Sequence, residues 1–136
     1  MDNDNNMLQS AKKREGEMTN KQLDKWLAEK VMGWTNNGVR WVDKDDKFDF
    51  YSDYITALTQ YPEAGKEWHP TTSIEQMYLC EDKIIEMELE QEYGDALEII
   101  LKKEYSYLPS TFQIAHASPE QRGKAIHQAL KEQERR

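Results

Sequence analysis

The residues best suited to chemistry form an acidic run in the first half of the chain: Asp43, Asp45, Asp46, Asp49 and Asp53. Carboxylates at alternate positions are the ligands that a calcium-binding loop supplies to its ion. In this run, however, Lys47 occupies a ligand position, and Phe48 stands where such a loop needs a glycine for its turn. The pattern therefore predicts an acidic, solvent-facing hairpin without a metal.

Histidine and cysteine, which bind zinc or act as nucleophiles, are few and scattered. His69, His116 and His127 have no spacing that would place two of them on one helical face, whereas zinc needs three or four convergent ligands. Cys80 flanks the apolar stripe of a predicted helix, and the adjacent Glu81 raises the pKa of a thiol, which disfavours a nucleophile. No phosphate-binding glycine loop, nucleophile elbow or nucleotide fingerprint occurs in the sequence. We therefore expect neither catalysis nor a cofactor, and a hydrolase that uses the scattered His and Asp residues is the least favoured hypothesis.

Aromatic side chains are the remaining candidates for a binding site, because Trp and Tyr are prominent both in cores and at interfaces. Core packing is expected to account for most of them, and any that are exposed would mark a protein interface or a base-stacking pocket. Together with part of the acidic run, they make up the predicted binding residues: Trp34, Trp41, Asp43, Asp45, Asp46, Tyr51, Tyr54 and Trp68.

The composition favours one globular domain with an acidic surface. The chain has 136 residues, of which 38% are hydrophobic and 10% aromatic, enough for a single core. The formal net charge of −8 repels nucleic-acid phosphate, so direct nucleic-acid binding is not expected.

The compartment is predicted by elimination. A single cysteine allows no intramolecular disulfide, and the polar N-terminus lacks the apolar segment of a secretory signal. No window approaches the roughly 20 apolar residues that a membrane helix requires. These features predict a soluble, cytoplasmic protein that does not enter a membrane.

The first helix and the strands after it are predicted from local signals. Thr19 and Gln22 have the spacing of a capping box, which opens a helix that Gly33 ends. The turn signal at residues 36–38 (Asn-Asn-Gly) and the alternation around Trp41 predict one or two short strands.

Two further helices are predicted in the second half of the chain. One is capped by Thr72 or Ser73 and leaves its helical pattern at Gly94. The last begins at Ser118-Pro119, with Ser as the cap and Pro in the first turn.

Between these two helices, the apolar residues suggest strands. Residues 96–101 form a short apolar run typical of a buried strand, and residues 112–115 would be its return strand. With a flexible arm over residues 1–17, the prediction is one α+β domain over residues 18–134. A small antiparallel sheet is expected between helices as an α–β–α sandwich, in the order helix, strands, helix, strands, helix.

Several segments together resemble the small phage and prophage proteins known as the phage ABA-sandwich domain. The resemblance rests on residues 27–34 (LAEKVMGW), Trp41-Val42-Asp43, residues 68–74 (WHPTTSI) and the helix from Ser118, and it covers roughly residues 19–131. It implies α–β–α layers and an origin in a phage genome, but no reaction. The chain departs from the pattern at Ser73, where the family usually has Asp, and in the length of residues 51–67.

The favoured hypothesis is therefore a phage accessory protein that binds a host or phage protein through its acidic, aromatic surface, for instance in counter-defence or host takeover. The alternative is a small-ligand binder that sequesters a signalling nucleotide, with aromatic rings on the base and Lys or Arg on the phosphate. A homodimer is the default oligomer, since two-fold pairs are the commonest.

Overall fold

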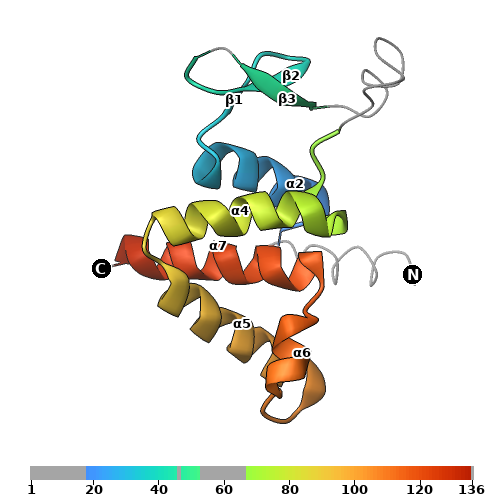
Figure 1. Cartoon of the computed structure of the whole chain (residues 1–136), viewed down its shortest axis with the longest axis vertical. Helices are drawn as coiled ribbons and strands as arrows, with labels where there is room; N and C mark the ends of the chain where they lie inside the picture. The colour runs from blue at the N-terminus through green and yellow to red at the C-terminus, as the bar shows by residue number, and fades with distance from the viewer. Residues whose placement is uncertain (1–17, 46, 53–66, 136) are drawn as a thin grey trace, which may run out of the picture.

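The computed structural model describes residues 18–45, 47–52 and 67–135, and the predicted arm over residues 1–17 lies outside them. Helices dominate the second half of this part, and the strands lie in the first half (Figure 1). The elements in chain order are α2 (Asn20–Trp26), the π-helical turn η1 (Leu27–Val31), β1 (Thr35–Asn36), β2 (Arg40–Val42), β3 (Phe48–Tyr51), the 3-10 turn η2 (Pro70–Thr72), α4 (Ile74–Glu86), α5 (Glu90–Tyr105), α6 (Thr111–Ala115) and α7 (Pro119–Arg135).

The predicted start and end of the first helix are confirmed. The Gln22 backbone N–H donates to Thr19 Oγ1 at 3.2 Å, and the Thr19 N–H donates to Gln22 Oε1 at 2.9 Å, which completes the capping box. Gly33 follows the helical segment with a φ of +74°, a conformation that other residues rarely adopt. Local chemistry therefore sets both boundaries of this segment.

A small antiparallel sheet is confirmed, although it has three short strands around Trp41, in the order β1-β2-β3, where one or two were expected. Asn37 Oδ1 accepts hydrogen bonds from the Val39 and Arg40 backbone N–H groups at 3.1 and 2.9 Å, and Gly38 has a φ of +102°. Trp41 lies opposite Phe50 in the register, and both side chains are buried. The sheet therefore contributes aromatic side chains to the core.

The two strands predicted near residues 96–101 and 112–115 are wrong, because these residues lie in α5 and α6. A short apolar run has no period that separates a buried strand from a helix. In α5, Ala96, Leu97 and Leu101 are buried, as expected for one side of a helix, whereas Ile99 is exposed. Gly94 is likewise not a helix exit, because the break comes earlier, at Glu88, which has a φ of +60°.

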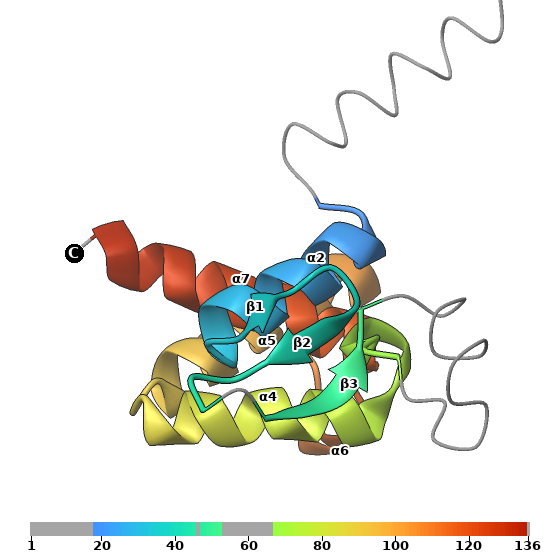
Figure 2. The ribbon, with the colours of Figure 1, turned by 90° about the horizontal axis from the view of Figure 1, so that it is seen from above.

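The helices lie on one side of the sheet (Figures 1 and 2). The sheet lies over η1, α4 and α7 come next, and α5 lies beyond them. The predicted α+β class is therefore confirmed. The predicted α–β–α order is wrong, because in the described part of the chain the sheet is an outer layer. None of the described helices is long and apolar enough to cross a membrane.

Candidate functional site

The predicted aromatic binding residues lie mainly in the core. Trp41, Tyr51 and Trp68 are only 4, 3 and 3% exposed, and Trp34 is half-buried. The ring centroids of Trp34 and Trp68 are 4.8 Å apart in an edge-on arrangement, and the Phe50 ring lies 5.0 Å from Trp68. These rings stabilise the packing of the sheet on the helices, and the burial of Trp41 and Trp68 leaves little ring surface for a ligand.

One hollow beside these rings bears on the nucleotide hypothesis. Trp41 and Trp68 line it together with Lys21 and Lys25, and the carboxylates of Asp24 and Glu67 offset the two positive charges. Its volume of about 230 Å³ is below the range of roughly 300–1,000 Å³ that small-molecule sites occupy. The Trp68 indole N–H is already used, since it donates to the Asp24 carbonyl at 2.8 Å.

Asp24 joins the first helix to η2 and has a perturbed pKa. Its Oδ1 accepts a hydrogen bond from the Thr71 backbone N–H at 2.9 Å. Burial raises the pKa of the Asp24 carboxyl, and this effect outweighs the hydrogen bond from Thr71, which lowers it. The ionised form is therefore less favoured in the folded chain than in the unfolded chain.

The Asp24→Asn variant is expected to differ from the wild type in its pH dependence. Since the folded-state pKa of Asp24 is raised, wild-type stability falls as the pH rises from the ordinary value of 3.8 through the raised one. The amide oxygen of Asn still accepts from Thr71, so Asp24→Asn should gain stability relative to the wild type across that window. Urea unfolding at several pH values measures the difference, and Asp24→Ala, which lacks the acceptor, serves as the control. A pH-independent difference for Asp24→Asn would contradict this assignment.

In the acidic run, the Asp43 carboxylate is held by backbone N–H groups that follow it in the chain. Asp43 Oδ1 accepts from the Asp45 and Lys47 N–H groups at 2.8 and 3.0 Å, and hydrogen bonds from Lys47 and Asp45 lower the pKa of Asp43. Asp46 and Tyr54 lie outside the described residues. Within the described ranges, no group of three or more His, Cys, Asp or Glu side chains could hold a metal ion.

Cysteine and histidine do not converge in the described part of the chain. Cys80 is fully buried in α4, and burial raises the pKa of its thiol. His69 contacts Thr72, and His116 stacks on Phe112. The His127 ring packs edge-on against Trp26 of the first helix.

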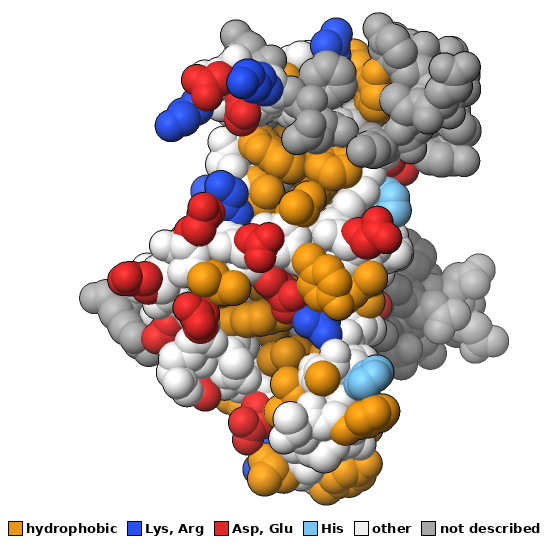
Figure 3. Space-filling view, viewed as in Figure 1, with side chains coloured by type: hydrophobic (Ala, Val, Ile, Leu, Met, Phe, Trp, Pro, Cys, Tyr) orange, Lys and Arg blue, Asp and Glu red, His pale blue; other side chains and the backbone are white. Residues whose placement is uncertain are grey.

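Among the described residues, the two most exposed large apolar side chains lie instead at the turn between α5 and α7. Phe112 is 70% exposed, Leu108 65% and Tyr107 56%, and no residue of the five-residue helix α6 is buried. Figure 3 shows hydrophobic side chains gathered at this end of the molecule. We call this surface the α6 knob, which consists of Tyr105, Tyr107, Leu108, Phe112 and His116.

Aromatic pairs and a helix cap order the α6 knob. The Tyr105 and Tyr107 rings are stacked at 5.9 Å, and Phe112 and His116 are stacked at 4.0 Å. Ser110 and Gln113 form a complete capping box, and the Gln113 side-chain amide also donates to the Tyr107 hydroxyl at 2.9 Å. The exposed rings are therefore held in place by local contacts although they are not buried.

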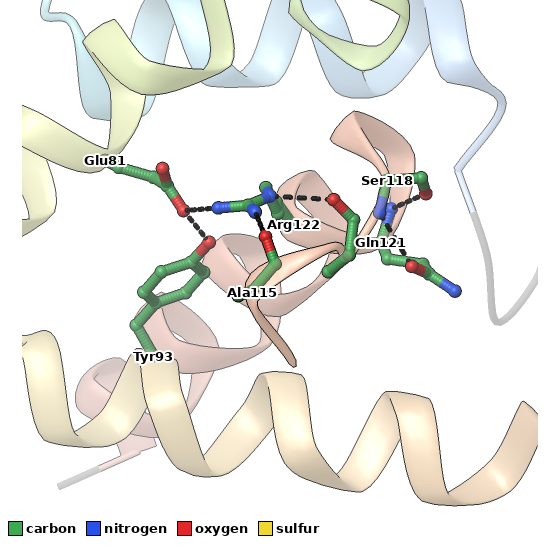
Figure 4. A network of polar contacts seen from close by, with 7 residues as sticks. Glu81, Tyr93, Ala115, Ser118, Gln121 and Arg122 are labelled. Atoms are coloured by element: carbon green, nitrogen blue, oxygen red, sulfur yellow. Dashed lines mark hydrogen bonds and ion pairs between the residues drawn. The ribbon is translucent and has the colours of Figure 1, made fainter. Parts of the chain in front are cut away.

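Arg122 of α7 anchors the end of α6 to the rest of the fold (Figure 4). Its Nη2 donates to the Ala115 carbonyl at 2.7 Å, and its Nε donates to the Ala117 carbonyl at 2.9 Å. Nη1 forms an ion pair with Glu81 of α4 at 3.0 Å, and Tyr93 of α5 donates its hydroxyl to the same carboxylate oxygen. The Arg122 and Glu81 side chains are only 11 and 16% exposed, so four helices meet at a largely desolvated pair.

The protonation states in this network are well defined. Burial alone lowers the pKa of Arg122, but the hydrogen bond and charge of Glu81 outweigh it and raise the pKa. Burial, and then the hydrogen bond to Glu81, raise the pKa of Tyr93. Arg122 is therefore a cation and Tyr93 a hydrogen-bond donor at neutral pH.

The α6 knob is absent from the predicted binding residues, and one signal in the sequence would have indicated its helix. Ser110 and Gln113 have the same spacing as Thr19 and Gln22, a pattern that opens helices. The strand predicted at residues 112–115 obscured it. The exposure of Phe112, by contrast, depends on the tertiary packing.

Comparisons with protein-family models, with curated proteins and with solved structures found no match to this chain. The relation to the phage ABA-sandwich domain therefore stays a prediction. The α–β–α layers that this resemblance implies are not matched in the described residues, where 96–101 and 112–115 lie in α5 and α6.

Proposed function

We propose that the protein acts by binding, and that the α6 knob inserts into an apolar pocket of a partner protein. The observation that carries the proposal is the exposure of Leu108 and Phe112 beside Tyr107 on a segment held by specific polar contacts. Large aromatic side chains dominate the binding energy of protein interfaces.

The order of the α6 knob favours association. A loose loop would lose conformational entropy on binding, whereas a capped helix fixed by Arg122 is already in one conformation. The four-helix network around Glu81 therefore has a role in binding: it holds the aromatic side chains of the knob in position.

The chemistry of the partner follows from the surface. The contact region has an apolar centre, and the net charge of −8 favours a partner with a basic surface around its pocket. The resemblance to phage proteins makes a bacterial host protein or another phage protein the first candidate, with counter-defence or host takeover as the role.

Two substitutions test the proposal without altering the core. Leu108→Ser and Phe112→Ser remove exposed side chains, so each should change the free energy of unfolding by only about 0.5 kcal/mol. Each should weaken partner binding by about 30-fold or more, as expected for an interface residue worth about 2 kcal/mol.

The matched control is Leu79→Ser, which removes a 40% exposed leucine from α4. Partner capture and titration calorimetry should show wild-type affinity for this variant. The proposal fails if Leu108→Ser and Phe112→Ser bind the partner as tightly as Leu79→Ser does.

A further inference from the structure

A second surface, separate from the α6 knob, lies along the seam between α5 and α7. Two adjoining hollows of about 340 and 350 Å³ follow these helices, and Ala96, Ile99 and Gln128 line both. Ile99 is 56% exposed although it lies between the two hollows. The seam therefore presents an exposed apolar side chain flanked by two depressions.

Charge is divided between the two ends of this seam. Lys103 and Lys124 line the hollow at one end, beside His127. Burial lowers the pKa of His127, so the two lysines carry the positive charge at this end. Glu92, Asp95 and Glu132 line the hollow at the other end.

Some of these charges lack a close counter-charge in the described part of the chain. Lys103 has no ion pair there, and one buried carboxylate oxygen of Glu92 has no hydrogen-bond partner there. Lys124, in contrast, pairs with Glu120 at 3.1 Å. Glu132 likewise pairs with Arg135 at 3.1 Å, whereas Asp95 accepts a hydrogen bond from the neutral Gln91 amide at 3.0 Å. Asp95 and Lys103 thus retain charge for an outside partner.

This distribution is self-complementary. Asp95 and Lys103 are eight positions apart in α5, or about 12 Å along the helix at a rise of 1.5 Å per residue. A two-fold axis through the seam near Ile99 reverses its direction and places each acidic end against a basic end. A partner of one charge sign would be attracted at one end and repelled at the other.

We propose that a second copy of this chain occupies the seam, so that the protein is a two-fold dimer in which Asp95 faces the partner's Lys103. Ile99 lies near the axis and buries its exposed side chain there. None of the α6 knob residues lines either hollow, so the dimer leaves both knobs accessible and does not rest on the proposed function.

Charge reversal in the full-length chain tests this arrangement by sedimentation velocity. The wild type is expected to sediment as a dimer. Asp95→Lys places a positive charge against the partner's Lys103, and Lys103→Glu places a negative charge against the partner's Asp95. Each variant should therefore raise the dimer dissociation constant by at least about tenfold.

An equimolar mixture of the two variants provides the decisive comparison. In the mixed pair, the lysine introduced by Asp95→Lys meets the glutamate introduced by Lys103→Glu, and the two unchanged residues meet at the second contact, so the dimer should return. The matched control is Lys102→Glu, which reverses a neighbouring charge that lines neither hollow and should leave the dimer intact.

Several outcomes would overturn the proposal: a monomeric wild type, an unchanged dissociation constant in both variants, or a mixture that stays monomeric. A dimer that Phe112→Ser dissociates, but the charge reversals do not, would assign self-association to the α6 knob instead.

Discussion

Replacing Arg122 by methionine is expected to lower the free energy of unfolding by about 3 kcal/mol. The substitution keeps much of the side-chain volume but removes the charge that pairs with Glu81 and three hydrogen-bond donors. Among the described residues, it leaves the largely buried Glu81 with the Tyr93 hydroxyl as its remaining partner, and an uncompensated buried charge is the costly outcome. The loss should also release the Ala115 and Ala117 carbonyls, so the end of α6 loosens.

The double variant Glu81→Gln/Arg122→Met separates charge from packing. Because neither charge remains, it should be more stable than Arg122→Met alone, although the hydrogen bonds to α6 are still missing. Urea unfolding measures the stabilities, and hydrogen exchange of the amides near His116 reports the order of α6. Equal stability of Arg122→Met and the wild type would show that the pair does not hold the helices together.

The second large effect is expected at Trp68. Trp68→Ala should lower the free energy of unfolding by about 4 kcal/mol, since it removes the ring that Trp34 and Phe50 pack against and leaves a cavity beneath the sheet. The substitution also removes the hydrogen bond from the indole N–H to the Asp24 carbonyl. Thermal and urea unfolding, followed by near-UV circular dichroism, measure the loss.

Trp68→Phe is the matched variant at this position. It retains an aromatic ring in the cluster and loses the indole donor and part of the volume, so a cost of about 1 to 2 kcal/mol is expected. If Trp68→Ala were as stable as Trp68→Phe, the aromatic cluster would contribute little to the packing of the sheet.

Local hydrogen-bond patterns made much of the fold predictable. The cap at Thr19, the cap at Ser73, and the cap at Ser118 with Gln121 all use a side chain three residues from its backbone partner, so short sequence windows contain them. The positive φ of Gly33 and Gly38 is equally local. The first helix, the hairpin and the last helix follow from such signals.

The remaining features depend on tertiary contacts. Residues 96–101 are apolar enough for a strand or a helix, and only packing against α7 decides between them. The same holds for the candidate site: Trp41 and Trp68 are as aromatic as Phe112, yet the first two are buried in the core and the third is 70% exposed. Residue type therefore indicated that aromatic side chains matter, but not which of them are exposed.

Site-specific photo-cross-linking tests the central claim, that the α6 knob contacts a partner protein, most directly. A benzophenone amino acid at position 112, and the same residue at position 79 as the control, would be irradiated in bacterial extracts and the adducts identified by mass spectrometry. Both positions are exposed, so incorporation should leave the fold intact. We predict a discrete adduct with one protein from position 112 and none from position 79. The absence of any adduct at position 112, or the same adducts from both positions, would contradict the claim.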